Sequence, residues 1–278
     1  ESVFSYFLSE LVTGNTPNPD ILCNKEIKFK EFYNYAMSND YDFIATGHYA
    51  ITDNQSLYKG IDNSKDQSYF LHAIDKEVLQ KTIFPLGELK KENVRQIAKE
   101  NSLITSNKKD STGICFIGER PFPEFVGSYL SGQEGNIINE NGEVIGIHQG
   151  LVFYTLGQRQ GLGVGGVKGS PDLPWYVAKK NIKTNELLCV QGNDHPLLFS
   201  RELFTKNLFK LEDSLPTSFE GTAKVRYRQE DQRCEINVED NALNIKFHKP
   251  QRSVTPGQSV VIYKNDKCLG GGEICTIN

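Results

Sequence analysis

The chemistry available to this sequence is concentrated first in residues 16–29, TPNPDILCNKEIKF. Cys23 follows Asp20 by three residues and stands just before an expected helix start at about Asn24. A thiol near a helix N-terminus feels the positive end of the helix dipole, which favours the nucleophilic thiolate. Asp20 suits a general acid or base but could equally cap the turn, and Cys23 could equally be a buried apolar residue.

A second thiol, Cys115, lies in the stretch KKDSTGICFIGER. Its neighbours Ile114 and Phe116 are apolar, which favours a buried strand. The bend expected at Gly113 and the charged residues on both sides make Cys115 the second candidate for chemistry. Two cysteines that are remote in the chain but close in space can exchange sulfur through a disulfide.

The remaining cysteines belong to no recognisable motif. No CxxC pair and no His/Cys spacing typical of zinc occurs, and a chain this long does not need disulfides to be stable. We therefore expect no bound metal and predict that these four residues are structural: Cys189, Cys234, Cys268 and Cys275.

Two further stretches place polar residues at the ends of expected elements. Residues 41–50, YDFIATGHYA, predict a buried strand that delivers Gly47 and His48 at its carboxyl end, where parallel sheets bind ligands. This loop could cradle a nucleotide or be an ordinary turn. Residues 65–67, KDQ, precede a helix, and in isolation Asp66 is best explained as its cap.

Basic and glycine-rich stretches give weaker signals. Residues 161–166 resemble a phosphate loop only superficially, because they do not lie between a strand and a helix, and a flexible β-loop is expected. Strand alternation is expected to put Arg226 and Arg228 on one face, near Arg233. That face could be solvated or could contact an RNA backbone.

The elements that position these residues change type along the chain. Helical periodicity predicts helices over 1–14, 25–39, 66–80, 89–101 and 123–130. From Gly132, β-branched residues and turn signals dominate, and Asn141-Gly142 predicts a hairpin. Short strands that recur from about Arg201 predict a small β-barrel. The fold class is therefore α/β followed by all-β, in three parts: residues 1–128, 129–199 and 200–278.

Composition limits the function classes. The 278 residues are 38% hydrophobic and 24% charged, as in ordinary globular proteins. The net charge of −4 argues against general coating of nucleic acid but leaves a local basic patch possible. No apolar run approaches the roughly 18 residues of a membrane helix, and no basic-then-apolar leader is seen, so we expect a cytoplasmic protein without membrane contact.

Five stretches occur together in one order: TPNPDILCNKEIKF, ATGHYA, KDQSYFL, DSTGICFIGER and YTLGQRQGLG. In this combination the chain resembles the tRNA-specific 2-thiouridylases, from about residue 1 to residue 278. The resemblance implies that the first part is the remainder of a nucleotide-hydrolase-like, Rossmann-like domain. It also implies that ATP, with Mg²⁺, adenylates the C2 oxygen of the wobble uridine of tRNA. A cysteine persulfide, loaded by an upstream sulfur-carrier protein, then supplies sulfur.

The resemblance also implies roles for individual residues. Cys115 matches the persulfide cysteine, and Cys23 matches the thiol that attacks the persulfide or resolves it as a Cys23–Cys115 disulfide. Asp20 matches the acid/base residue beside the target base, with Asn18 and Pro19 lining its pocket. Gly47 matches an ATP contact. The matched tRNA contacts are His48, Lys65, Asp66, Gln67, Arg226, Tyr227 and Gln258.

One departure from the family pattern affects the expected activity. The family begins with a strand and an SGGxDS-type loop that grips the ATP phosphates, and this sequence contains no such segment. We therefore expect an N-terminally truncated form that does not adenylate RNA by itself. The alternative is a non-catalytic tRNA-binding remnant. A methyltransferase is disfavoured, because no glycine-rich loop for adenosylmethionine follows a first strand.

Overall fold

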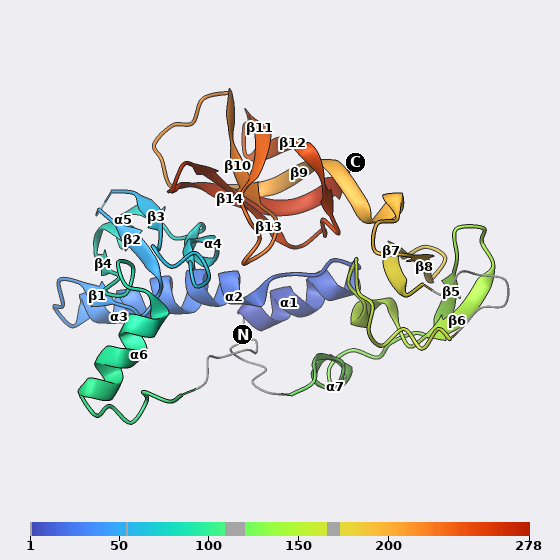
Figure 1. Cartoon of the computed structure of the whole chain (residues 1–278), viewed down its shortest axis with the longest axis horizontal. Coiled ribbons are helices and arrows are strands. Elements are labelled where there is room, and N and C mark those ends of the chain that lie inside the picture. The colour runs from blue at the N-terminus through green and yellow to red at the C-terminus, as the bar shows by residue number, and fades with distance from the viewer. Residues whose placement is uncertain (1, 54, 109–119, 166–172) are drawn as a thin grey trace.

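The computed structural model describes residues 2–53, 55–108, 120–165 and 173–278, which form three connected parts (Figure 1). Helices and short strands make up the first part, a small sheet the second and a barrel the third. The barrel lies above α1 and α2 in the view of Figure 1, and the small sheet lies to the right. In the described ranges, no helix is both long enough and apolar enough to cross a membrane.

The first helices run almost end to end. α1 (Ser2–Val12) buries Phe7 and Leu11 against Phe125 of α7 (Phe122–Gly127). After a loop, α2 (Pro19–Leu22), the π-type helix η1 (Cys23–Phe32) and α3 (Tyr33–Ser38) follow one another without a break. The helix expected from about Asn24 thus begins at Pro19, because the Asn18 side chain caps it and proline fits the first turn.

Two pairs of short strands follow. β1 (Ile44–Ala45) pairs in parallel with β4 (Thr82–Ile83), which confirms a strand before Gly47 but shortens it to two residues. β2 (Ala50–Thr52) and β3 (Leu57–Lys59) form an antiparallel pair, and β3 continues the barrel sheet by pairing with β14. Main-chain hydrogen bonds therefore join the first part to the third.

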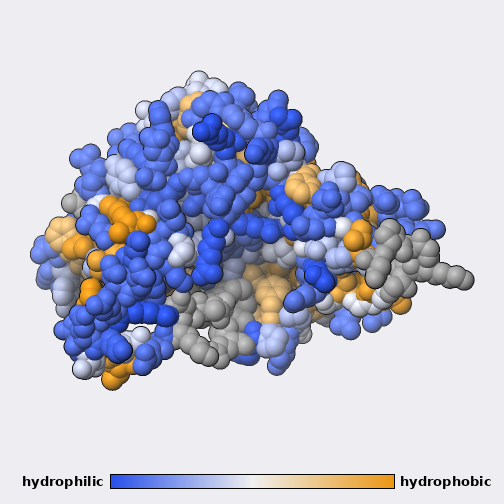
Figure 2. All heavy atoms as spheres, in the orientation of Figure 1, coloured by the Kyte–Doolittle hydropathy of each residue, from blue (hydrophilic) through white to orange (hydrophobic). Residues whose placement is uncertain are grey.

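The helices that follow fit the sequence prediction in part. The single helix predicted over 66–80 is wrong: α4 (Ser68–Leu71) and α5 (Lys76–Gln80) are separated by Asp75, whose backbone is extended with ψ 140°. α6 (Lys91–Glu100) confirms the helix predicted over 89–101. The face seen in Figure 2 is mostly hydrophilic, with apolar patches at the end that holds α3 and α6 and others near the middle and on the side of the small sheet.

The second part is a four-stranded sheet in the order β6-β5-β8-β7. β5 (Gly135–Ile138) and β6 (Val144–His148) form the predicted hairpin, and Gly142 takes the positive φ of +79° that its turn requires. After the short helix η2 (Leu151–Phe153), β7 (Trp175–Asn181) pairs with β8 (Glu186–Gln191). The fully buried Ile137, Val177 and Leu187 form the core of this sheet.

The third part is a closed six-stranded barrel that follows the short helix η3 (Pro196–Leu198). Its strand order is β13-β10-β11-β12-β9-β14, and pairing of β13 with β14 closes it, which leaves no exposed strand edge around the ring. The predicted fold class is therefore confirmed. The strands are β9 (Phe199–Lys210), β10 (Ser218–Lys224), β11 (Gln232–Glu239), β12 (Ala242–Arg252), β13 (Ser259–Lys264) and β14 (Lys267–Ile277). The exact domain boundaries stay predictions.

The strand face predicted to hold Arg226 and Arg228 does not exist. β10 ends at Lys224, and the chain then turns, with Arg228 at a left-handed φ of +64°. The turn forms because the Gln229 side chain accepts a hydrogen bond from the Val225 N–H at 2.8 Å. The two arginines therefore lie in a loop and do not share a pleated surface.

The cysteines outside the motifs are mostly buried, as expected. Cys189, Cys234 and Cys268 have no exposed surface, and burial raises the pKa of each thiol to about 12. Cys275 is exposed, because it follows the buried Ile274 on β14 and faces outward.

Candidate functional site

A pocket of about 550 Å³ lies where the three parts meet. The loop before α2, the turn after η2 and two barrel loops supply its walls. Five of its residues were predicted from sequence: Asn18, Asp20, Arg226, Tyr227 and Gln258. The pocket is lined by Asn18, Asp20, Phe70, Thr155, Leu156, Gly157, Gln158, Arg226, Tyr227, Thr255 and Gln258.

The start of α2 positions Asp20. Asn18 Oδ1 accepts a hydrogen bond from the Asp20 N–H at 3.2 Å, and the buried Pro19 occupies the first helical position. Asp20 therefore stands in the first turn, where the helix dipole stabilises a carboxylate. Cys23 is half-buried one turn further on and is absent from the pocket lining. The expected dipole effect on Cys23 is thus wrong, because that effect is confined to the first turn.

Cys115 lies outside the described residues. Its structural relation to Cys23, including the predicted disulfide, therefore stays a prediction.

A series of hydrogen bonds links the first turn of α2, which holds Asp20, to the residues that follow β1. Asn24 Nδ2 donates to the Asp20 carbonyl at 2.9 Å, and His48 Nε2 lies 3.1 Å from Asn24 Oδ1. His48 Nδ1 lies 2.8 Å from Thr46 Oγ1. Burial lowers the pKa of His48 to about 4, so the ring is neutral at neutral pH. His48, predicted to contact tRNA, is only 7% exposed and here braces the site from within.

Gly47 occupies a different position, at the open carboxyl end of β1. It is exposed, and among the residues that the structure describes only the Leu86 side chain, at 3.8 Å, lies near an added Cβ. A nucleotide backbone can therefore approach this loop without steric conflict. This room is compatible with the predicted ATP contact.

The barrel contributes an aromatic and cationic wall. The rings of Tyr227 and Phe70 lie 4.4 Å apart between centroids, inclined at 47°. Arg226 Nη2 donates to the Ser253 carbonyl at 2.6 Å, which fixes one end of the guanidinium. Burial and the neighbouring Arg252 guanidinium both lower the pKa of Arg226 from its high ordinary value. Among the residues that the structure describes, no carboxylate forms an ion pair with Arg226.

Gln258 joins the barrel to the loop that precedes Asn18. Its Nε2 donates to the Thr16 carbonyl at 2.6 Å, and the Thr16 N–H donates to the Pro256 carbonyl at 2.9 Å. The backbones approach so closely that a Cβ on Gly257 would lie 2.8 Å from Thr16 N. Gly257 also has a positive φ of +88°, so only glycine fits without strain.

The second part supplies the wall that sequence analysis missed. Gly157, with φ +79°, packs so closely on the barrel that a Cβ would lie 2.1 Å from Ser253 Oγ. The Thr155 N–H donates to Gln158 Oε1 at 3.0 Å, which shapes the turn. The stretch YTLGQRQGLG contributes to the family resemblance, but the sequence alone predicts no binding or catalytic role for its residues. Phe70 likewise stood unassigned in KDQSYFL.

The KDQ stretch lies outside the pocket lining. Asp66 is 5% exposed, and its Oδ1 accepts hydrogen bonds from the N–H groups of Gly60 at 3.2 Å and Ser68 at 3.1 Å. Gln67 Oε1 accepts from the Tyr49 N–H at 3.0 Å. Lys65 is partly exposed. The structure therefore makes Asp66 an internal anchor that lies one residue before the N-cap position of α4, which Gln67 occupies. In the same described ranges, no three His, Cys, Asp or Glu side chains are grouped to hold a metal ion.

Comparisons with known families cover most of the chain. The family described as "tRNA methyl transferase HUP domain" matches residues 1–119. Residues 123–191 match "tRNA methyl transferase PRC-barrel domain", and residues 200–274 match "Aminomethyltransferase beta-barrel domain". These matches agree with a Rossmann-like part, a small β-rich part and a C-terminal barrel.

Similar curated proteins carry one name. The "tRNA-specific 2-thiouridylase MnmA" of Francisella tularensis subsp. holarctica (strain FTNF002-00 / FTA) is 55% identical over 281 residues. The alignment covers 99% of this chain and 78% of that protein. The proteins of the same name from Francisella philomiragia and from F. tularensis subsp. novicida are also 55% identical over the same shares of both chains.

Proposed function

The chain belongs to the tRNA-specific 2-thiouridylase family, and we propose that it thiolates tRNA. The observation that carries this proposal is the pocket shared by Asp20, Arg226 and Tyr227. Asp20, the acid/base candidate, lines the same cavity as the cationic Arg226 and the aromatic Tyr227. Asp20 lies about two hundred positions before Arg226 and Tyr227 in the sequence, so only folding brings the carboxylate to this wall.

The pocket has the features that recognition of an extruded base requires. Enzymes that modify a base commonly take it out of the stack, place it against aromatic side chains and read its polar edge. Tyr227 and Phe70 offer aromatic surface, while Asn18, Gln158 and Gln258 offer polar groups. Arg226 is suited to a neighbouring phosphate.

Asp20 and the two motif cysteines carry the proposed chemistry. ATP, with Mg²⁺, supplies an adenylyl group that makes the C2 oxygen of the wobble uridine a leaving group. The terminal sulfur of a persulfide on Cys115, loaded by a sulfur-carrier protein, bonds to C2 as the adenylated oxygen departs. Attack of the Cys23 thiolate on the Cys115 sulfur breaks the S–S bond and leaves a Cys23–Cys115 disulfide. A cellular thiol must reduce this disulfide before another turnover.

The surrounding residues complete the proposal. Asp20 exchanges a proton with the target base, and Asn18 and Pro19 hold Asp20 in place. The loop at Gly47 is proposed to contact ATP. Lys65 and Gln67 border the tRNA path, while Asp66 and His48 support it from inside. A cytoplasmic location, where tRNA is found, is part of the same proposal.

The test measures 2-thiouridine in cellular tRNA by mass spectrometry of the hydrolysed nucleosides. The gene is deleted at its own locus, or changed there to encode Asp20→Asn. We expect 2-thiouridine to disappear in both strains. Unchanged 2-thiouridine in the deletion strain would overturn the function. Loss in the deletion strain alone would retain the function and remove Asp20 from the mechanism.

A further inference from the structure

The loop that carries Arg226 and Tyr227 is closed at its base by an ion pair. We call residues 225–230, between β10 and β11, the Arg226 loop. Lys224 and Asp231 flank it on either side, and Lys224 Nζ lies 3.6 Å from Asp231 Oδ1. The two ends of the loop are therefore held together by their own side chains.

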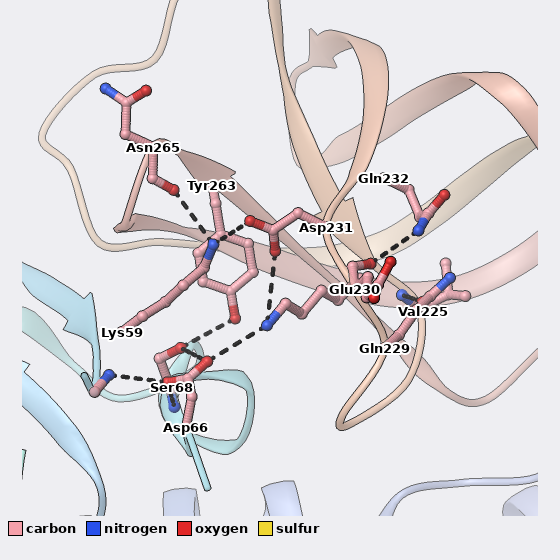
Figure 3. A network of polar contacts seen from close by, with 12 residues as sticks. Lys59, Asp66, Ser68, Val225, Gln229, Glu230, Asp231, Gln232, Tyr263 and Asn265 are labelled. Carbon is pink, nitrogen blue, oxygen red and sulfur yellow. Dashed lines mark hydrogen bonds and ion pairs between the residues drawn. The ribbon is translucent and has the colours of Figure 1, made fainter. Parts of the chain in front are cut away.

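The same two side chains also bind the first part of the molecule. Lys224 Nζ lies 3.5 Å from Asp66 Oδ2. Lys59 Nζ, from the end of β3, donates to Asp231 Oδ2. Figure 3 shows the result as an alternating series of two ammonium groups and two carboxylates that spans the junction. The Arg226 loop is thus fastened to β3 and to the loop before α4.

Three of these four charges lie largely out of water, and the fourth, Asp231, is 34% exposed. The side chains of Lys59, Asp66 and Lys224 are 7%, 3% and 11% exposed. Both ammonium groups lie over the ring of Tyr263, at 4.4 Å for Lys59 and 5.5 Å for Lys224. Burying a charge is costly unless it is paired, so the pairing of the buried Lys59, Asp66 and Lys224 through Asp231 favours this position of the loop.

The frame to which the loop is fastened is itself fixed. Asp66 Oδ1 accepts the two backbone hydrogen bonds described above, and Asp66 Oδ2 accepts a third hydrogen bond from Ser68 Oγ at 3.1 Å. Ser68 Oγ in turn lies 3.2 Å from the hydroxyl of the fully buried Tyr263. α4, which begins at Ser68, also carries Phe70, the ring that faces Tyr227 in the pocket. One network therefore sets both halves of the aromatic wall.

We propose that Lys59, Lys224 and Asp231 are positioning residues for RNA recognition. They hold the Arg226 loop at the pocket so that Arg226 and Tyr227 meet the RNA without a prior ordering step. This inference rests on the proposed function, because it requires that tRNA be the ligand. A network that only stabilised the fold would affect unfolding, but it would leave the contribution of Arg226 to RNA binding unchanged.

The experiment is a double-mutant cycle between Asp231 and Arg226, whose side chains are not in contact. Affinity for unmodified tRNA is measured at several salt concentrations for the wild type, Asp231→Asn, Arg226→Ala and the double variant. We expect Arg226→Ala to weaken binding about tenfold in the wild type and much less in the Asp231→Asn background. The dependence of tRNA affinity on salt concentration is expected to weaken in each single variant. The double variant should show little further change in this dependence.

A matched control uses another ion pair. Asp213→Asn removes the partner of Lys76, 2.7 Å away, in an ion pair that shares no residue with the network and whose Asp213 side chain is 88% exposed. It is expected to leave the cost of Arg226→Ala at about tenfold. Where Asp231→Asn fails to fold, as judged by circular dichroism, Lys224→Gln takes its place in the cycle.

Equal costs of Arg226→Ala in both backgrounds would overturn the positioning role. Absence of tRNA binding by the wild type would instead remove the proposed function itself.

Discussion

Asn18 caps the helix that presents Asp20: its Oδ1 accepts the Asp20 backbone N–H at 3.2 Å, and both side chains line the same pocket. The cap fixes where the helix starts and therefore which residue occupies the dipole-stabilised first turn. The Asn18 side-chain oxygen thus places Asp20 in the first turn of the helix, where the dipole stabilises negative charge, and leaves Cys23 three positions further on.

Asn18→Ala is expected to lower the free energy of unfolding by about 1 kcal/mol, because one N–H at the helix start loses its partner. 2-Thiouridine formation should fall further than this loss of stability explains, since Asp20 is no longer held. Asn39→Ala, which removes one exposed hydrogen bond to the Tyr35 carbonyl at the end of α3, is the control. Equal effects of the two variants on thiolation would contradict the role of the cap.

The buried histidines predict a loss of stability in acid. Burial lowers the pKa of His48 and of His72 to about 4, from 6.5 in the unfolded chain. Between these values the unfolded state binds more protons, so stability is complete above pH 6.5 and falls as the pH approaches 4. Each histidine contributes up to about 3 kcal/mol over this range.

His48→Gln should therefore flatten the dependence of the unfolding free energy on pH in part, because His72 and His148, whose pKa burial also lowers, remain. Urea denaturation at a series of pH values measures it. His248→Gln, at a side chain that is 52% exposed, is the control and should leave the slope as it is. A slope that His48→Gln leaves unchanged would show that His48 is protonated without unfolding.

Arg226→Ala is expected to weaken tRNA binding about tenfold and to reduce the salt slope of the binding constant by about one. The reason is the loss of one guanidinium that no carboxylate of the described residues neutralises. Binding is measured by filter retention from 50 to 300 mM salt, about the range in which such slopes are linear. Arg233→Ala, on the exposed outside of β11, should leave the slope nearly unchanged. Identical slopes for both variants would exclude Arg226 as a phosphate contact.

Gly257→Ala is expected to destabilise the protein by about 2–3 kcal/mol, through a positive φ and a contact with Thr16 N at 2.8 Å. Gly142→Ala shares the positive φ, +79°, but has no atom within 4 Å of the added Cβ, and should cost only about 1 kcal/mol. Denaturant titration compares them. Equal losses would show that the close approach of the two backbones contributes nothing.

The parts predicted correctly from sequence are those that depend on local patterns. The helix over 89–101, the Asn141-Gly142 hairpin and the series of barrel strands follow from periodicity and turn residues. The Arg226 loop was mistaken for a strand because alternation continues through KVRYRQ. The strand ends because the Gln229 side chain accepts a hydrogen bond from the Val225 N–H, and the hydrophobic pattern of the sequence does not reveal such a bond.

The missed features depend on residues that meet only in the folded chain. The predicted tRNA contact of His48 stays a prediction, but its burial beside Asn24 of η1 could not be read from the sequence around either residue. Motif matching supplied Asp20, Arg226 and Gln258, yet nothing local placed Phe70 or Gln158 beside them. Asp66 was expected to cap a helix, but Gln67 takes the N-cap position of α4, and the Asp66 carboxylate binds the N–H groups of Gly60 and Ser68 instead.

The pairing of β3 with β14 bears on how the protein forms during synthesis. Leu57, fully buried, finds its strand partner in Cys268, so an early hairpin must wait for a late strand to leave the ribosome. Such distant pairing slows folding and leaves apolar surface open to chaperones or to aggregation in the meantime. Emergence of β14 from the ribosome, more than completion of the first part, is then the step at which the molecule acquires its native sheet.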